Sequence, residues 1–387
     1  MYATIFLKKN EETRLKEGHP WVFSSEVDKI KGYFVSGDLV EVRAFNNEFI
    51  GIGYVNTASK IWIRLLTRNE EIIDEDFFLG KIREANDLKK MLGFENNYRV
   101  VFAEADFLPG LIIDKYGDYL VAQFLTLGMD KRKDLIISAL VKIFNPLGIY
   151  ERSDVDVRLK EGLEKIKEVR YGNVPESIEI IENGIKLNID IINGQKTGYF
   201  LDQKKNRLFL QNISYGKDVL DCFSNVGGFG LNALKGGAKN VTFVDISKRA
   251  CEEIERNAKL NNFINYRVLC EDVFNYLKTV KEEFDIVVLD PPAFTKTKEK
   301  KENAYKGYKE INSLGIKLVK NHGILISCSC SEHMDRITFL SLFKEINYEN
   351  NYHLKLIGEF YQSFDHPRLI GADENLYLKC LVFEVVK

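Results

Sequence analysis

The chain has 387 residues, more than one ordinary domain holds, so two or three domains are expected. Its hydrophobic fraction of 45% and charged fraction of 29% are those of a soluble globular protein. The formal net charge of -2 argues against a protein that coats nucleic acid indiscriminately, so any affinity for nucleic acid must come from local clusters of basic side chains.

Hydropathy and cysteine usage exclude further classes of protein. The sequence contains no run of about 18 apolar residues, which excludes a membrane span. The first residues, MYATIFLKKN, lack the order of a signal peptide, so a cytoplasmic protein is expected. Its six cysteines are therefore expected to be reduced, and no C-x-x-C pair indicates zinc, so no metal site is predicted.

Residues 1–73 have the pattern of short strands separated by turns. GDLVEVRAF and EFIGIGYVN, joined by two asparagines, are typical of a β-hairpin, and KIWIRLLTR predicts another strand. This pattern predicts a small β-barrel-like domain at the N-terminus.

Residues 74–175 change to a mixed pattern. DEDFFLGKIREANDLKKMLG has helical spacing, with acidic residues at its start and a glycine at its end. Two strand-like stretches, YRVVFAEAD and LIIDKYGDYLVAQFL, precede a second helix, KRKDLIISALVKIF. A central α+β domain is therefore predicted.

Residues 185–387 alternate between strands and helices. This order predicts parallel βαβ units in a doubly wound α/β sheet, which binds ligands beyond the carboxyl ends of its strands. The predicted strands are KDVLDCF, NVTFVDIS, YRVLCED, FDIVVLDPP and GILISCS. The residues at their ends are Asp221, Asp245, Asp272, Asp290 and the pair Cys328/Cys330.

The loop DCFSNVGGFG follows the first of these strands. Its Gly227 and Gly228 allow a ligand to approach the backbone closely and allow tight packing of helix on strand. The loop does not fit G-x-G-x-x-G, which weakens a nicotinamide interpretation. Asp245 can accept hydrogen bonds from ribose hydroxyls, and Asp272 lies where it can reach an adenine amino group.

This order of acids and glycines resembles that of class I S-adenosylmethionine (SAM) methyltransferases, in which several carboxylates suit a cationic sulfonium. The alternative is that Asp221 and Asp272 are ordinary residues of turns at strand ends. The resemblance implies SAM as cofactor. The implied cofactor-binding residues are Asp221, Phe223, Asn225, Gly227, Gly228, Asp245, Asp272 and Asp290.

The stretch VVLDPPAF narrows the substrate class. Asp290 at a strand end, followed by Pro291 and Pro292, presents an acid and an apolar shelf to a flat ring. D-P-P-x occurs in methyltransferases that act on ring nitrogens, exocyclic amines or ring carbons of nucleobases. The alternative is that Asp290 only begins a turn, because two prolines end a strand.

Two cysteines in ISCSCS bear on the type of methylation. Cys328 and Cys330 would point the same way if the strand continues through both. Carbon 5 of cytosine or uracil attacks a methyl sulfonium only after a thiolate has added to carbon 6, which is nucleophilic covalent catalysis. Asp290 would then hydrogen-bond ring nitrogen 3 of cytosine.

Several motifs together resemble the ribosomal RNA large-subunit methyltransferase I family. They are S-C-S followed by Met334, VLDPPAF, GQKTGYFLDQKKNR, GHPWVFSSEV near the start and DHPRLIGADENLYLKCLVFEV near the end. The resemblance covers nearly the whole chain. It implies SAM-dependent formation of 5-methylcytosine in 23S ribosomal RNA, an N-terminal PUA domain that binds RNA, a central α+β domain and a possible homodimer.

By position in the family's S-C-S motif, the implied nucleophile is Cys330, with Asp290 as its catalytic partner. Strand alternation does not separate Cys330 from Cys328, for which a buried position in the strand is expected. Ala293 stands where another branch of RNA cytosine methyltransferases has a second cysteine, which leaves open what takes the carbon 5 proton. Core positions without chemistry are expected for Cys222, Cys251, Cys270 and Cys380.

The motif KTGYFLDQ supplies further substrate candidates. Tyr199 and Phe200 could wall the cofactor or a flipped base, with Lys196 near phosphate; an ordinary strand and turn is the alternative. The predicted substrate-binding residues are Lys196, Tyr199, Phe200, Pro291, Pro292 and Phe294. The basic run KTKEKKEN after Phe294 could bind RNA phosphates or be a solvated loop.

Three other functions remain open at this point. A related SAM enzyme could methylate a guanine ring nitrogen or exocyclic amine, which needs no thiol. A non-catalytic RNA-binding ribosome assembly factor would bind RNA without methyl transfer. A nicotinamide oxidoreductase fits the glycine loop least.

Overall fold

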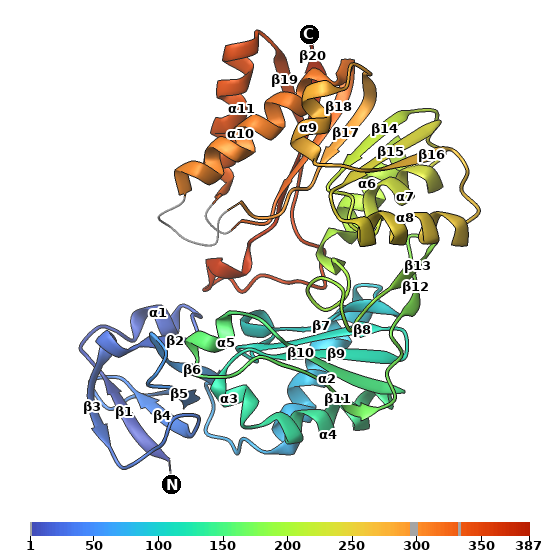
Figure 1. Cartoon of the computed structure of the whole chain (residues 1–387). Coiled ribbons are helices and arrows are strands. Elements are labelled where there is room, and N and C mark those ends of the chain that lie inside the picture. Colours follow the sequence, from blue (N-terminus) through green and yellow to red (C-terminus); the bar gives the residue numbers. More distant parts are fainter. Residues whose placement is uncertain (1, 295–300, 332–333) are drawn as a thin grey trace. The chain divides into compact units, whose positions relative to one another are not determined.

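The computed structural model of the protein describes residues 2–294, 301–331 and 334–387, and Figure 1 labels its elements. The chain forms two compact units, each assembled from several stretches of sequence. The first unit comprises Met1–Ile178, Ile189–Leu201 and Phe364–Asn375, and the second comprises Glu179–Asn188, Asp202–Ser363 and Leu376–Lys387. This grouping differs from the predicted 185–387 domain, because two of its segments belong to the first unit.

The first unit begins with a six-stranded sheet in the order β2-β6-β5-β4-β1-β3. The predicted hairpin is confirmed: β4 and β5 pair antiparallel, with Leu39 opposite Tyr54. Alternate residues of β4 are buried, as expected for a strand with one face on a core. The strands are β1 (Ala3–Leu7), β2 (Trp21–Phe23), β3 (Val27–Lys31), β4 (Leu39–Arg43), β5 (Phe49–Val55) and β6 (Ile61–Thr67).

A second sheet in this unit has the order β11-β10-β9-β8-β7, and the predicted helices α2 and α4 pack against each other. α2 begins at Glu75 because the Asp74 carboxylate accepts a hydrogen bond from Phe77 N at 3.1 Å. The strands are β7 (Asn97–Phe102), β8 (Leu111–Tyr116), β9 (Tyr119–Phe124), β10 (Gly148–Ser153) and β11 (Ile166–Gly172). The helices are α1 (Thr13–Lys16), α2 (Glu75–Met91), α3 (Leu127–Asp130), α4 (Lys133–Phe144) and α5 (Val157–Lys160).

A two-stranded sheet of β12 (Ile178–Glu182) and β13 (Ile185–Ile189) precedes the large sheet of the second unit. The seven strands of that sheet are β14 (Asp218–Cys222), β15 (Asn240–Asp245), β16 (Tyr266–Cys270), β17 (Phe284–Leu289), β18 (Val319–Ser329), β19 (His353–Phe360) and β20 (Lys379–Val386). The helices are α6 (Lys204–Ile213), α7 (Gly228–Lys235), α8 (Lys248–Leu260), α9 (Val273–Thr279), α10 (Lys301–Lys317) and α11 (Arg336–Asn350).

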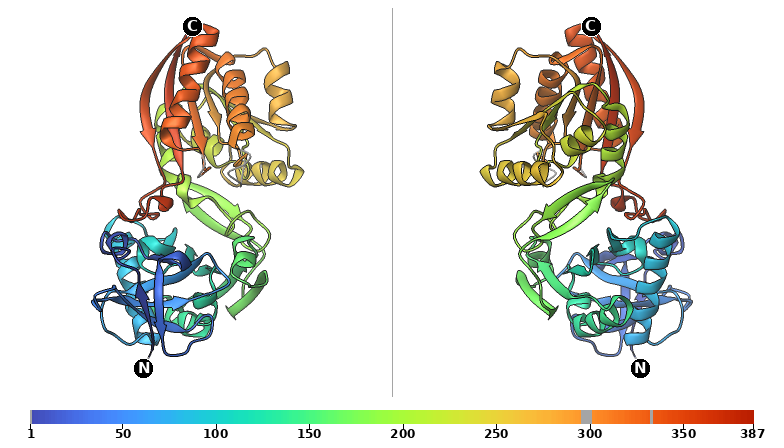
Figure 2. Two further views of the ribbon diagram at one scale, coloured as in Figure 1. Left: turned by 90° about the vertical axis from the view of Figure 1, so that its left-hand side faces the viewer. Right: turned by 90° about the vertical axis from the view of Figure 1, so that its right-hand side faces the viewer.

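The strand order β16-β15-β14-β17-β18-β20-β19 confirms a doubly wound sheet. Helices cover both of its faces (Figure 2), with α6 against α7, and α10 between α9 and α11. The last hairpin differs from the parallel pattern, because β20 runs antiparallel to both β18 and β19. The chain order reverses between β14 and β17, and a ligand of such a fold binds at this switch point.

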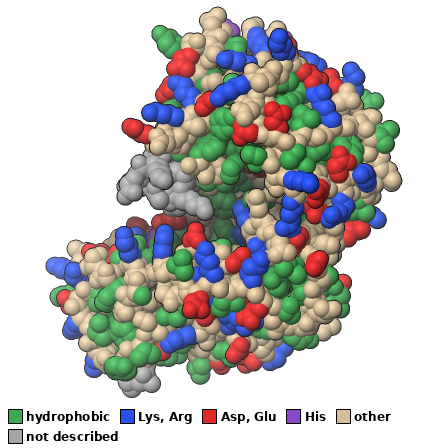
Figure 3. Space-filling model, in the orientation of Figure 1, with side chains coloured by type: hydrophobic (Ala, Val, Ile, Leu, Met, Phe, Trp, Pro, Cys, Tyr) green, Lys and Arg blue, Asp and Glu red, His purple; other side chains and the backbone are tan. Residues whose placement is uncertain are grey.

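Surface charge and helix hydropathy add little to this architecture. Acidic and basic side chains are interspersed on the visible face of each unit (Figure 3). Over the described ranges, every helix is too short or too polar to cross a membrane.

Candidate active site

Asp221 lies in β14 at the switch point of the large sheet. Asp221 is buried, with 1% of its surface exposed to solvent. Oδ2 accepts a hydrogen bond from Gly230 N at 2.8 Å, whereas Oδ1 has no hydrogen-bond partner among the described residues. Burial, with the neighbouring carboxylates of Asp290 and Asp245, raises the pKa of Asp221 to about 8 against the opposing effect of the Gly230 bond. A buried carboxyl oxygen of this kind is typical of a ligand site.

Glycines bring α7 close to this carboxylate. A Cβ built on Gly230 would lie 2.1 Å from Cε1 of Phe243 in β15, so this approach of helix to strand requires glycine. Gly227 has a φ of 87° and is the N-cap of α7, and a Cβ there would lie 3.1 Å from Leu231 Cδ1. Gly227 therefore forms the turn, and Gly228 begins the helix. The closest approach, at Gly230, was missed from the sequence although it ends the same glycine loop.

The loop between β14 and α7 holds Asp245 in place. Phe223 and Asn225 both have left-handed backbone angles, with φ of 60° and 52°. Asn225 N donates to Asp245 Oδ2 at 2.9 Å, and Ser247 N donates to Oδ1 at 2.9 Å. Asp245 is thus fixed at the end of β15 and remains partly exposed.

The residues of this site fit a cationic ligand. Asp221, Asp245 and Asp290 gather at one end of the sheet, and the last two add to the raised pKa of the first. A bound cation would lower the electrostatic repulsion between these neighbouring carboxylates. SAM carries a sulfonium and an ammonium group, whereas a nicotinamide dinucleotide carries a pyrophosphate that these acids would repel. The donor set therefore fits SAM and disfavours the nicotinamide interpretation.

Asp272 occupies a different local position from the other acids. β16 ends at Cys270, and Asp272 is the N-cap of α9, where its Oδ1 accepts a hydrogen bond from Asn275 N at 2.9 Å. One oxygen of the carboxylate is thus engaged in capping, as the turn-residue alternative implies. The second oxygen is the one that could meet a ligand.

Asp290 follows β17 and is positioned by a residue to which the sequence assigned no role. Gln203 Nε2 donates to Asp290 Oδ2 at 3.0 Å. Asn206 Nδ2 donates to Gln203 Oε1 at 2.6 Å, which directs the NH2 group of the carboxamide toward Asp290. Both amide residues are buried. Gln203 stands in the same KTGYFLDQ motif as the substrate candidates, which is the signal that could have found it.

The structure distinguishes the two cysteines of ISCSCS. β18 ends at Ser329, so Cys330 lies beyond the strand and the condition for a shared face is not met. Cys328 is fully buried opposite Cys380 of β20. Burial, followed by the interaction with Cys380, raises the pKa of the Cys328 thiol well above its usual value. Cys330 is partly exposed. Accessibility therefore favours Cys330 over Cys328 as a nucleophile.

The two expected catalytic residues lie around one phenol. Tyr308 of α10 is buried, and burial raises its pKa above the ordinary value; the nearby Ser329 side chain opposes this shift, and the nearby Cys330 and Asp290 add to it. Asp290 and Cys330 follow β17 and β18, which are parallel neighbours. The carboxyl ends of these two strands thus bring an acid and an accessible thiol together.

Aromatic rings border this part of the site. Phe294 contacts Tyr308 edge-to-face with ring centres 4.7 Å apart, and Phe274 with ring centres 6.0 Å apart. Pro291 is buried, whereas Pro292 is exposed. Phe294 is partly buried against the core, so one part of its ring packs on the protein and another part is accessible.

Three predicted substrate-binding residues belong to the first unit rather than to the second. Lys196 is exposed, with Nζ 4.3 Å from the ring centre of Phe200. Tyr199 is buried, and its carbonyl accepts a hydrogen bond from the Tyr116 hydroxyl at 3.4 Å. These three residues therefore belong to a different compact unit from the carboxylates.

The remaining cysteines follow the prediction with one exception. Cys222, Cys251 and Cys380 are buried, but Cys270 is exposed, so its predicted core position is wrong. The physical reason is that β16 is an edge strand whose residues are half-buried or exposed.

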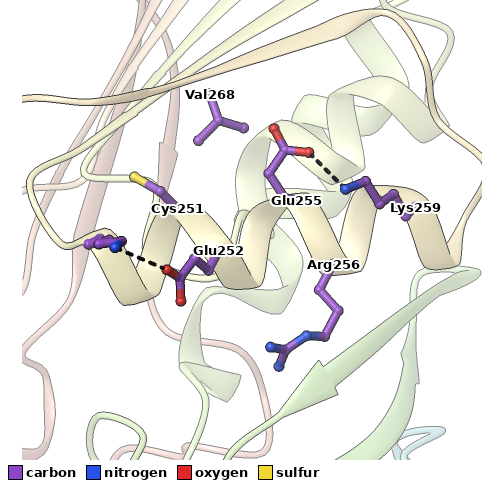
Figure 4. A pocket seen from close by; sticks show the side chains of 7 residues that line it. Cys251, Glu252, Glu255, Arg256, Lys259 and Val268 are labelled. Atoms are coloured by element: carbon purple, nitrogen blue, oxygen red, sulfur yellow. Dashed lines mark ion pairs between the residues drawn. The ribbon is translucent and has the colours of Figure 1, made fainter.

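An open pocket lies along α8 beside the edge strand β16, and none of Asp221, Asp245 and Asp290 lines it (Figure 4). Two ion pairs, Lys248–Glu252 and Lys259–Glu255, cross it with N–O distances of 3.9 and 3.8 Å. It is lined by Lys248, Cys251, Glu252, Glu255, Arg256, Lys259 and Val268.

The basic run after Phe294 lies, over residues 296–300, outside the described residues.

Family models match both ends of the chain. Residues 5–68 match the PUA-like domain, and residues 162–358 match the S-adenosylmethionine-dependent methyltransferase family. A protein of Aliivibrio fischeri named ribosomal RNA large subunit methyltransferase I is 40% identical over 396 residues, covering 100% of both chains. A protein of Vibrio cholerae with the same name is 39% identical over 398 residues, again covering 100% of both.

Solved structures share the fold. A protein of Streptococcus mutans assigned as a SAM-dependent methyltransferase superimposes with a TM-score of 0.84 at 23% identity, covering 99% of this chain and 100% of its own. Another methyltransferase structure, complexed with SAH, has a TM-score of 0.86 at 24% identity, with coverage of 99% and 100%. At this identity, the likeness establishes the architecture alone.

Proposed function

Because the chain belongs to the ribosomal RNA large subunit methyltransferase I family, we propose that it transfers a methyl group from SAM to carbon 5 of a cytosine in 23S ribosomal RNA. The observation that carries this proposal is the partly exposed Cys330 just beyond the end of β18, the parallel neighbour of β17, which Asp290 follows. A methyltransferase that acts on a guanine nitrogen has no use for such a thiol.

In the proposed reaction the Cys330 thiolate forms a bond to carbon 6 of the cytosine. Carbon 5 becomes enamine-like and nucleophilic, while Asp290 hydrogen-bonds ring nitrogen 3. SAM, when bound, would supply the electrophilic methyl group to carbon 5 and leave as S-adenosylhomocysteine. A base then removes the carbon 5 proton, the bond between sulfur and carbon 6 breaks, and the aromatic ring and the free thiol return.

The cofactor is proposed to lie at the switch point. Asp221 and the loop with Phe223, Asn225, Gly227 and Gly228 would hold its methionine part, since Asp221 Oδ1 is buried there without a partner among the described residues. Asp245 would accept the ribose hydroxyls and Asp272 the adenine amino group, with Asp290 closing the site. Gln203 would hold the Asp290 carboxylate in place through the 3.0 Å hydrogen bond.

The proposed substrate-binding residues come from two stretches of the chain. Pro291, Pro292 and Phe294 would form the apolar shelf for a flipped base, and Lys196, Tyr199 and Phe200 would contact the RNA or the base. The proposed division of labour is RNA binding by residues 1–73, support by the central domain 74–175 and catalysis by 185–387.

We also propose a cytoplasmic location and a homodimer. The named relatives are bacterial, and ribosomal RNA is a cytoplasmic molecule in bacteria. The dimer follows from the family resemblance, and light scattering of the purified protein tests it.

The test is transfer of tritium-labelled methyl from SAM to ribosomal RNA, with separate 23S and 16S species and nucleoside analysis. Wild type should give 5-methylcytidine in 23S RNA. Cys330→Ala should lower the rate by ~10³-fold or more because the nucleophile is lost. Cys328→Ala is the matched control, two residues away, and should retain transfer once corrected for stability.

Other outcomes assign the chain differently. Label in a methylated guanosine that survives Cys330→Ala would overturn the cytosine assignment and leave a SAM-dependent nitrogen methyltransferase. RNA binding without transfer to naked RNA or ribosomal particles would indicate an assembly factor.

A further inference from the structure

Cys251 and Cys270 lie near each other, outside the proposed active centre. Cys251 lies in the first turns of α8, and Cys270 is the last residue of the neighbouring edge strand β16. Cys251 Sγ lies 3.9 Å from the carbonyl oxygen of Leu269, the residue before Cys270, and Cys270 pairs in the sheet with Asp245, whose carbonyl Cys251 also contacts. The two thiols therefore form a pair, not two isolated cysteines.

The pair supports the turn that follows β15. Cys251 Sγ donates to the Asp245 carbonyl at 3.5 Å, and Cys270 Sγ donates to the Ile246 carbonyl at 3.7 Å. Glu271 N also donates to the Asp245 carbonyl, at 3.0 Å. The two thiols thus donate hydrogen bonds to two consecutive carbonyl groups, those of Asp245 and Ile246. Any change in the thiols acts directly on the backbone that carries Asp245.

Both sulfur atoms have a route to small molecules. Cys270 is exposed. Cys251 is largely buried, but it borders the open pocket on α8, where its sulfur points toward the sheet beside Val268 (Figure 4). Burial, followed by the interaction with Cys270, raises the pKa of Cys251 to about 12, so the exposed Cys270 is the thiol that reacts first.

We propose that Cys251 and Cys270 form a reversible disulfide site whose oxidation by a low-molecular-weight disulfide weakens SAM binding at Asp245. The inference rests on the proposed placement of the cofactor. It assigns chemistry to two thiols that the methyl-transfer reaction does not use.

The oxidation proceeds in two thiol–disulfide exchanges. The Cys270 thiolate attacks the small disulfide, forms a mixed disulfide and releases one small thiol. The Cys251 thiolate then attacks Cys270 Sγ, the protein disulfide forms and the second small thiol leaves. Two electrons and two protons have passed from the protein thiols to the small disulfide, which becomes two thiols.

Oxidation changes the turn because a disulfide has no S–H donor. The carbonyls of Asp245 and Ile246 lose the hydrogen bonds from the two thiols, and the new bond draws β16 toward α8. Loss of such bonds predicts a fall in SAM affinity of roughly three- to tenfold. The Asp245 carboxylate itself remains present, so binding is weakened and not abolished.

The experiment treats the full chain with oxidised glutathione. Non-reducing peptide mass spectrometry should detect a Cys251–Cys270 linked peptide, and calorimetric titration should show weaker SAM binding that dithiothreitol restores. Cys270→Ser keeps a hydroxyl donor toward Ile246, so it should bind SAM normally and ignore the oxidant. Cys330→Ala should respond like wild type, which separates the effect from the partly exposed thiol of the active site.

Three results would overturn the inference: no linked peptide, a Cys270 that stops as the glutathione mixed disulfide, or a linked protein with unchanged SAM affinity. The variant Asp245→Ala distinguishes a failure of the disulfide proposal from a failure of the proposed SAM site. Normal SAM binding by Asp245→Ala would refute the site itself, whereas weak binding combined with redox-insensitive wild type would refute only the disulfide effect.

Discussion

In the first unit Arg99 donates two hydrogen bonds of 2.8 Å to the buried Asp114 carboxylate, whereas at the switch point of the second unit the buried Asp221 has two further carboxylates as electrostatic neighbours. Lys89 and Asp106 repeat the first arrangement, both buried and in direct contact. The first unit thus neutralises its buried charges internally.

The difference separates charges that maintain the fold from charges that await a ligand. A buried ion pair is compensated within the protein, so removing one partner destabilises the fold. A group of like charges raises the free energy of the ligand-free protein through electrostatic repulsion. A bound cationic ligand lowers this repulsion. A variant that breaks an ion pair of the first unit should therefore lower stability and leave SAM binding unchanged. A variant that removes a carboxylate at the switch point should weaken SAM binding and raise stability.

The largest effect is expected in the first unit. Arg99→Leu leaves the Asp114 carboxylate buried with the hydroxyl of Thr197 as a remaining donor at 2.6 Å. An uncompensated buried charge of this kind lowers the free energy of unfolding by about 3–5 kcal/mol, which urea denaturation measures. SAM affinity of the folded protein should stay unchanged.

The matched control is the exposed ion pair of Arg256 with Glu253 in α8. Arg256→Leu should change the free energy of unfolding by less than about 1 kcal/mol. An Arg99→Leu protein that is stable but binds SAM poorly would break the distinction between the two regions.

The opposite result is expected at the switch point. Asp221→Asn should weaken SAM binding by ~10- to 100-fold, because one carboxylate facing the cation is lost. The same change should raise the melting temperature by about 2–4 °C, since the protein no longer buries this carboxyl among like charges. Calorimetric titration and thermal unfolding measure the two effects.

The pH dependence sharpens this prediction. With a pKa of about 8 in the free protein, Asp221 must lose a proton when the cation binds, so wild-type affinity should increase from pH 6 to 8. An unfolded Asp ionises near ~3.9, so between that value and about 8 the folded state holds more protons and the free energy of unfolding falls as the pH rises. Asp221→Asn should flatten both trends, and equal slopes in the two proteins would contradict the assignment.

A smaller effect is expected at Gln203. Gln203→Glu places a second carboxylate against Asp290 Oδ2, so the pair must share a proton, and methyl transfer at pH 7.5 should fall by about tenfold. The loss should recover as the pH is lowered. Gln203→Met, which removes the donor without adding charge, should lower the rate without shifting the pH profile. Identical pH profiles of methyl transfer for the two variants would indicate that Gln203 only packs in the site and does not position Asp290.

Local pattern determined much of the architecture. The β4–β5 hairpin follows from two alternating stretches around two asparagines, and α2 follows from helical spacing after the capping Asp74. The acids at the ends of β14, β15 and β17 could be found because each lies at or just beyond the carboxyl end of an apolar stretch. These features depend on neighbours along the chain, which a sequence displays.

Long-range packing decided the rest. Cys328 and Cys330 are equivalent by alternation, and they differ only because β18 ends at Ser329 and β20 covers Cys328. Gln203 reaches Asp290 across 87 positions, and Cys270 is exposed because nothing pairs with the outer edge of β16 among the described strands.

The sequence by itself therefore determined the family, the order of the elements and the set of acids. Only the tertiary structure decided which thiol is accessible, which amide positions Asp290 and which segments join the first unit. The physical reason is that burial and side-chain contacts are set by strand order and strand length, and residues far apart in the chain fix both.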